Sequence, residues 1–268
     1  MMQTTGFYQL QLSLEKEHFA RLATSVDFEN ITKGRQGNHL VQLQEQSVPI
    51  VRTTTQYTIP AHEFAPIHHQ LIQQLNEVIK QSPTIPVLDL AFNNALIEIY
   101  TQEYFKMKYH SDQALDLDIG SYIALFSCYE YPETLTKRQL RTLKVKDKTT
   151  HEEFSFSLAH NSVILFSLET NTRFSHKIVL EPAPQKSAAI AENRWLGITF
   201  RQSKTFIHFE EGAPYFSNGA PLTLAEEQQQ KTFYRLRGQE NRSQDFVYPS
   251  LSYTLSQGDL LSPKLRKL

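Results

Sequence analysis

The stretch from Val87 to Arg201 decides the fold, because it is a succession of short runs rich in Ile, Val, Leu, Phe and Tyr. The runs are VLDLAF (87–92), ALIEIYT (95–101), SYIALFSCYEY (121–131), RTLKVKD (141–147), EEFSFSL (152–158), SVILFSL (162–168), HKIVLEP (176–182) and RWLGITFR (194–201). Runs of this length and composition, separated by turn-like segments, are typical of strands. Their close succession favours an antiparallel sandwich or barrel over alternating βαβ units.

The residues on either side of this block are expected to flank it. The segment Gly6 to Ser13 alternates apolar and polar residues, which predicts a strand. Two helices are predicted, over Glu63 to Lys80 and over Thr223 to Leu236. The first has apolar residues at four-residue spacing: Ile67, Leu71, Leu75 and Ile79. We therefore divide the chain into an N-terminal extension (1–85) with a supporting helix and a substrate lid, a β-rich core (86–205) and a C-terminal extension (206–268).

Composition restricts the class of protein. The chain has 268 residues, of which 40% are hydrophobic and 21% charged, as in an ordinary soluble globular protein. The net charge of −1 provides no global attraction to nucleic acid, so any such binding needs a local patch. One cysteine cannot form an internal disulfide, and the N-terminal residues do not resemble a secretory signal. We expect a cytoplasmic protein that does not cross a membrane.

The segment Tyr109-His110-Ser111-Asp112 carries the first sign of chemistry. In an extended strand, residues i and i+2 point to the same face, so His110 and Asp112 can enter one cavity. An imidazole and a carboxylate are two of the three ligands of a facial triad for iron(II). Among the ten histidines, His176 is the best candidate for the third ligand, because it opens the predicted strand HKIVLEP and would lie at a barrel rim.

The run Asn193 to Thr205 supplies arginines that suit a dicarboxylate, since guanidinium groups bind carboxylates with two parallel hydrogen bonds. Strand alternation places Thr199 and Arg201 toward the cavity. Arg194 has the opposite parity. A β-bulge near Gly197 would shift the phase by one residue and bring Arg194 into the cavity as well.

The order of these motifs resembles the AlkB-like branch of the 2-oxoglutarate and iron(II)-dependent dioxygenases. The resemblance covers roughly residues 95–205 and implies a mainly β (α+β) fold, a double-stranded β-helix or jelly-roll core with flanking helices. It implies iron ligation by His110, Asp112 and His176. It further implies cosubstrate contacts from Tyr100, from Arg194 at the distal carboxylate and from Arg201 near the proximal one; Thr199 is our own addition to this set.

The sequence departs from the family pattern at several positions. The two arginines stand one residue further apart than in the family, and Glu98 stands where an asparagine is usual. The nucleic-acid repair members carry an acid shortly after the metal aspartate, and Ala114 stands there. Asp116, two residues further on, is a candidate substitute. With Tyr109 and Gln113, Asp116 completes our candidate substrate contacts.

The predicted function is a dioxygenase that uses Fe(II), 2-oxoglutarate and dioxygen to hydroxylate or oxidatively dealkylate its substrate. Alkylated nucleic acid is one substrate class, favoured by the resemblance and by the basic run Lys137 to Lys148. A protein or a small molecule is the alternative, favoured by the neutral net charge and by Ala114. Two other classes remain open: a non-enzymatic β-sandwich binding module, and a zinc hydrolase on a barrel, which would give the arginines no role.

Overall fold

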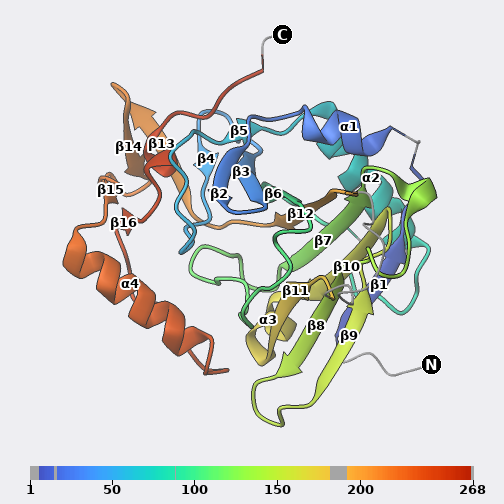
Figure 1. The fold of residues 1–268 in the computed structure, drawn as a ribbon. Helices are drawn as coiled ribbons and strands as arrows, with labels where there is room; N and C mark the ends of the chain where they lie inside the picture. Colours follow the sequence, from blue (N-terminus) through green and yellow to red (C-terminus); the bar gives the residue numbers. More distant parts are fainter. Residues whose placement is uncertain (1–5, 15–16, 88, 182–191, 267–268) are drawn as a thin grey trace.

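The computed structural model describes residues 6–14, 17–87, 89–181 and 192–266. A large sheet runs through the molecule in the order β1-β10-β7-β12-β6-β3-β2, with neighbours antiparallel and β5 added parallel to β3 (Figure 1). Its strands are β1 (Phe7–Gln11), β2 (Glu29–Thr32), β3 (Arg35–Val41), β5 (His62–Glu63), β6 (Asn94–Tyr100), β7 (Tyr122–Tyr129), β10 (Ser162–Ser167) and β12 (Trp195–Arg201).

Three smaller sheets complete the fold. The antiparallel sheet β11-β8-β9 consists of β8 (Thr142–Asp147), β9 (Glu153–Ser157) and β11 (Phe174–Val179). The others are β14-β13-β4 and the parallel pair β15-β16, formed by β4 (Val48–Pro49), β13 (Phe206–Glu210), β14 (Ala213–Phe216), β15 (Thr223–Leu224) and β16 (Tyr253–Thr254). The predicted mainly-β, antiparallel architecture is confirmed.

Helices lie around these sheets (Figure 1). They are α1 (His18–Ala23), α2 (Pro66–Lys80), α3 (Leu168–Arg173) and α4 (Glu227–Glu240), with short 3₁₀ turns η1 (Pro132–Thr134) and η2 (Gln257–Leu260). Within the described residues, none of the helices has the length and apolar character that crossing a bilayer requires.

The large sheet is buried on both faces, and each face belongs to a different core cluster. One cluster joins α2 to the outward residues of the sheet, such as Ile97, Phe126 and Leu196. The other lies between the large sheet and β11-β8-β9 and includes Leu125 and Val145. Because both faces are covered, the central strands are apolar at nearly every position.

Helix α2 confirms the predicted apolar repeat, since Ile67, Leu71, Leu75 and Ile79 are all buried. It begins at Pro66, three residues later than expected. Proline is favoured at the first helical position, where its fixed φ suits the helix and no N–H is needed. The other predicted helix also begins later: residues 223–224 form β15, and α4 ends at Glu240.

Strand β12 alternates as predicted, but without a bulge. Its pairing with β6 and β7 is continuous through Gly197, so the expected β-bulge is wrong. The close approach at Gly197 comes instead from the Trp195 ring, which would meet a Cβ at Gly197 at 2.0 Å. Glycine is therefore required there for packing.

Two other expectations, a strand at 87–92 and a strand that begins at His176, differ from the structure. The described residues of VLDLAF (87 and 89–92) form no strand, although Leu90 and Phe92 are buried; Leu88 lies outside the described residues, as does Pro182 of HKIVLEP. Strand β11 begins at Phe174, so His176 is its third residue. The N-terminal strands β1, β2 and β3 belong to the large sheet, while the proposed lid role of residues 1–85 stays a prediction.

Candidate metal centre

A backbone bridge brings the two candidate histidines together. His110 lies in the connection between β6 and β7, and it pairs with His176 of β11 across an isolated antiparallel bridge. The His110 N–H donates to the His176 carbonyl at 3.0 Å, and the His176 N–H donates to the His110 carbonyl at 2.7 Å. This pairing fixes two side chains, 66 positions apart in the chain, at neighbouring places on one surface.

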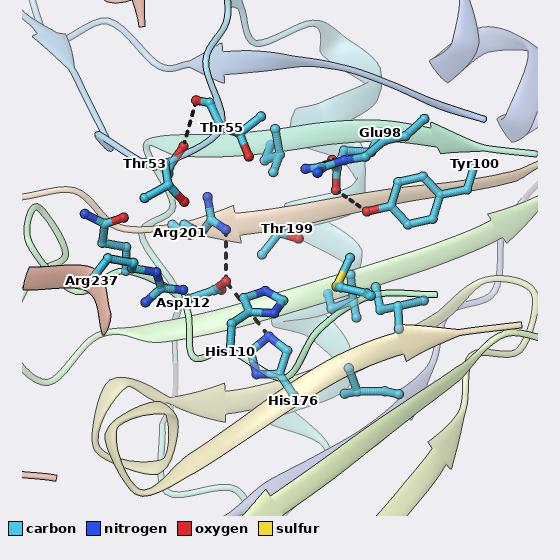
Figure 2. A pocket seen from close by; sticks show the side chains of 18 of the residues that line it. Thr53, Thr55, Glu98, Tyr100, His110, Asp112, His176, Thr199, Arg201 and Arg237 are labelled. Atoms are coloured by element: carbon cyan, nitrogen blue, oxygen red, sulfur yellow. Dashed lines mark hydrogen bonds and ion pairs between the residues drawn. The ribbon is translucent and has the colours of Figure 1, made fainter. Parts of the chain in front are cut away.

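His110, Asp112 and His176 can hold one metal ion. One ligand atom from each residue lies within 4.8 Å of the others. Nε2 of His176 is 4.0 Å from Oδ1 of Asp112, and the two imidazole centroids are 4.9 Å apart. Figure 2 shows the three side chains pointing toward one another. Two imidazoles and one carboxylate are the donor set of a facial triad, which leaves coordination positions free for other ligands.

The protonation states suit a metal. Burial and the neighbouring imidazole of His176 lower the pKa of His110 to about 3, and burial also lowers the pKa of His176. Both rings are therefore neutral near pH 7. Nδ1 of His110 lies 3.0 Å from the carbonyl oxygen of Lys108, which can only accept, so Nδ1 carries the proton and Nε2 offers its lone pair to a metal.

Asp112 is held as a carboxylate by its neighbours. Burial raises the pKa of Asp112, but the guanidinium of Arg201 and the two imidazoles outweigh it and bring the pKa down to about 2. Nη2 of Arg201 donates to Oδ1 of Asp112 at 3.1 Å. The other oxygen of Asp112, and Nε and Nη1 of Arg201, are buried and have no partner among the described residues. Such orphaned groups fit a site built for a cation and an anion.

The loop that carries Asp112 is anchored from both sides. Asn171 of α3 accepts the Asp112 N–H at 2.7 Å and donates to the Asp112 carbonyl at 2.8 Å. The hydroxyl of Ser111 donates to the carbonyl of Phe174 at 2.9 Å, at the start of β11. This loop, which we call the metal loop, therefore packs against β11, which carries His176, and against the preceding helix α3.

Helix α4 anchors the other side of this loop. Asn241, directly after the helix, accepts the Ser111 N–H at 3.0 Å, and Arg237 donates to the Ser111 carbonyl. The carboxylate of Glu240 accepts the Ala114 N–H at 2.7 Å and pairs with Arg237. The C-terminal extension is thus part of the support of the site.

The triad lies in a cavity of about 110 Å³, several times the room that one water molecule needs. Four of the remaining predicted residues line it: Tyr100, Gln113, Thr199 and Arg201. The amide of Gln113 is buried and unpaired. The walls are completed by apolar side chains, among them Met107, Leu125, Leu143, Phe166 and Ile178.

Three predicted residues do not line this cavity. Arg194 is bound to Glu130 through two hydrogen bonds of 2.7 Å and lies over the ring of Phe19, so the expected cosubstrate contact is corrected. Asp116 is fully buried in a two-point ion pair with Arg52 and is a structural residue here.

Tyr109, the third of these residues, lies beside two lysines instead of lining the cavity. Its ring lies 4.1 Å from the ammonium of Lys177 and 5.9 Å from that of Lys146. Any contact of Tyr109 with a substrate would therefore take place outside the metal cavity.

The cavity also contains residues that the sequence did not indicate. Arg35 of β3 and Arg237 of α4 line it, as do Thr53, Thr54 and Thr55 of the loop after β4. Glu98, noted only as a departure from a pattern, lines it too. No local motif marks the two arginines or the three threonines, because they belong to segments outside the β-rich core.

The family match agrees with this donor set. The sequence profile of the 2OG-Fe(II) oxygenase superfamily matches residues 9–201. Among solved structures, OsALKBH1 is similar over 74% of this chain and 98% of its own, with 15% identity and a TM-score of 0.44. A prolyl-4-hydroxylase from Pseudomonas putida is similar over 74% of this chain and 94% of its own, with 14% identity and a TM-score of 0.41. No curated protein sequence matches significantly.

Proposed function

Because this chain belongs to the 2OG-Fe(II) oxygenase superfamily, we propose that His110, Asp112 and His176 hold its iron(II). It is a 2-oxoglutarate-dependent dioxygenase with a jelly-roll core. The observation that carries the assignment of the ligands is the convergence of the three ligand atoms within 4.8 Å. Their neutral and anionic protonation states support it, since a metal needs lone pairs free of protons.

Arg201 is proposed to bind the proximal carboxylate of 2-oxoglutarate. Its Nη2 bonds to Asp112, but its Nε and Nη1 are buried and unpaired, and buried donors without an acceptor are costly. Thr199, two residues earlier on the same face of β12, adds a hydroxyl to this wall. When bound, the iron and its cosubstrate supply the oxidising chemistry. The chain orients both, and its apolar walls exclude water.

The reaction proposed is hydroxylation of a substrate C–H bond, which becomes dealkylation where the carbon is attached to nitrogen. Gln113 is the candidate substrate contact inside the cavity, because its buried amide has donors and an acceptor that are unpaired. A small molecule or a protein side chain could be held by such an amide.

Nucleic acid is the second candidate substrate, and the observation that favours it is Tyr109 with Lys177 beside the metal loop. An aromatic ring next to a cation can stack a base and hold a phosphate. The basic hairpin supports it less, since Lys144 pairs with Glu181 and Lys146 lies 3.5 Å from Glu153. Single-stranded oligonucleotides at two salt concentrations separate the candidates, because phosphate binding weakens steeply with salt.

The test of the proposed function is succinate release from 2-oxoglutarate by the iron-loaded protein under air. We expect release by the unaltered chain and none by His110→Ala. Metal content, measured on the same samples, should fall with activity. Succinate formation by His110→Ala at the unaltered rate, with iron still bound, would remove this residue from the site.

A further inference from the structure

We propose that Arg35, together with Tyr100, forms the subsite for the distal carboxylate of 2-oxoglutarate, and that Glu98 is the resident counterion which the cosubstrate displaces. This inference rests on the proposed function and concerns how that cosubstrate is held. It assigns the task to a strand of the N-terminal extension instead of to β12.

Strand β12 has no arginine for this task. Arg194 forms an ion pair with Glu130 outside the cavity. The pairing of β12 with β6 is continuous, so no bulge turns Arg194 toward the cavity. The family's shorter spacing between the two arginines would place a guanidinium at position 195, where Trp195 stands. The Trp195 ring is buried, covers Gly197 and lies 4.8 Å from the ring of Tyr100. A buried apolar ring therefore stands beside Tyr100 where the family's spacing would place a guanidinium.

Arg35 supplies the missing guanidinium from β3, which pairs with the edge of β6 opposite to β12. It is paired with Tyr100 across β3 and β6, and Tyr100 is paired in turn with Trp195 across β6 and β12. The three residues form one row across the sheet. The side chain of Arg35 is only 15% exposed, and it lines the same cavity as the triad.

The arrangement around Glu98 is that of a bound carboxylate. Oε1 of Glu98 accepts from Nε and Nη2 of Arg35 at 2.6 Å, and Oε2 accepts from the hydroxyl of Tyr100 at 2.7 Å. Figure 2 shows the carboxylate of Glu98 beside the tyrosine hydroxyl, within the cavity. A guanidinium and a phenol that converge on a carboxylate of the chain can converge equally on a carboxylate of a ligand.

The register gives the distance that the ligand and the side chains have to span together. Arg201 is opposite Asn94 and Gly197 is opposite Glu98, so the rows of Arg201 and Glu98 are four residues apart, about 13 Å along the strands. The terminal carbons of an extended five-carbon dicarboxylate are roughly 5 Å apart at about 1.5 Å per bond. The long side chains of Arg201 and Arg35 both line the cavity, and their reach into it has to bridge the remainder.

Glu98 then sets the affinity of the protein for 2-oxoglutarate. It is 7% exposed, so its charge is poorly screened by water. An incoming carboxylate must share or take over the guanidinium of Arg35 in the presence of this like charge. Removing the charge of Glu98 while keeping its shape should strengthen cosubstrate binding, and removing the guanidinium of Arg35 should weaken it.

The experiment compares 2-oxoglutarate with 2-oxopentanoate, which has the same carbon chain and a methyl group in place of the distal carboxylate. Each is titrated without air into the iron(II)-loaded protein, and the visible charge-transfer band of the complex reports binding. We expect Arg35→Met to raise the Kd of 2-oxoglutarate about tenfold or more, as the loss of a charged hydrogen bond implies. The Kd of 2-oxopentanoate should change less than about threefold.

Two further variants sharpen the comparison. Glu98→Gln should lower the Kd of 2-oxoglutarate severalfold without a matching gain for 2-oxopentanoate. Arg194→Met is the matched control, because it also removes an arginine from a glutamate pair, but outside the cavity. It should leave both constants unchanged. Arg35→Lys retains a cation and should recover part of the preference for the dicarboxylate, which a purely structural role would not predict.

The outcomes separate the two proposals. If neither 2-oxo acid produces a band with the unaltered protein, the proposed function is overturned and the inference with it. If both acids bind but Arg35→Met weakens them equally, or weakens neither, the inference alone is overturned. The same holds if Arg194→Met, and not Arg35→Met, removes the preference for 2-oxoglutarate.

Discussion

Replacing Glu240 with alanine is expected to loosen the metal loop and to destabilise the protein. The Glu240 side chain is 8% exposed, accepts the Ala114 N–H at 2.7 Å and the Tyr248 hydroxyl at 2.7 Å, and pairs with Arg237. Its loss leaves a poorly exposed guanidinium without its carboxylate and a backbone donor without an acceptor. Breaking a buried pair in this way costs about 3–5 kcal/mol.

The shift in Tm follows from the size of the chain. At about 2.1 cal/mol/K per residue, 268 residues have an entropy of unfolding of about 0.56 kcal/mol/K. A loss of about 4 kcal/mol therefore lowers Tm by about 7 °C. Metal affinity should fall about 10- to 100-fold, as when an outer support of a metal ligand is removed, because Arg237 and Glu240 hold the residues on either side of Asp112.

The assays are calorimetry of the metal-free protein and a titration with iron(II) without air. Glu227→Ala is the matched control on the same helix, because its side chain is 84% exposed and its pair with Lys231 is on the surface. It should change stability by less than about 0.5 kcal/mol. Equal effects of the two substitutions, or an unchanged metal affinity in Glu240→Ala, would refute the role given to α4.

The remaining predictions concern the core, pH and metal. Leu71→Ala should cost about 2–5 kcal/mol in urea unfolding, because the leucine is 1% exposed beneath the large sheet; a cost below 1 kcal/mol would mean that α2 is not packed as described. Burial lowers the pKa of His39 and of His68 from 6.5 to about 3, so the unfolded chain binds more protons between these values. Stability should therefore fall as pH drops below about 6.5, by about 2 kcal/mol for each histidine at pH 5, and His68→Gln should flatten that slope. Iron(II) at about 100 times its Kd should stabilise the protein by about 2.7 kcal/mol; His176→Ala should abolish this gain, and its retention would exclude His176 as a ligand.

Much of the site could be predicted from sequence where the signal is local. The parity of β12 placed Thr199 and Arg201 on the cavity face, because side chains alternate along a strand whatever surrounds it. The spacing of His110 and Asp112 predicts that both enter one cavity, and both line it. The resemblance to a family then indicated Tyr100, which does line the cavity.

The failures share one cause, which is that they depend on contacts between distant segments. The expected contact of Arg194 with the cosubstrate requires a bulge, and the pairing of β12 with β6 and β7 contains none. Asp116 is a plausible substrate contact by sequence, but Arg52, 64 residues away, holds it in a buried ion pair. The run VLDLAF (87–92) has the composition of a strand, but no strand pairs with its described residues.

What the sequence by itself determined is the set of chemical groups and their local directions: β-rich runs, two metal ligands on one face and an arginine at the end of a cavity strand. These follow from the short-range geometry of the backbone. The tertiary structure alone decided which groups meet. It brought His176 to His110 through one backbone bridge, turned Arg194 away and placed Arg35 against Glu98. Such meetings depend on strand order and register across the whole chain, which no short stretch of sequence encodes.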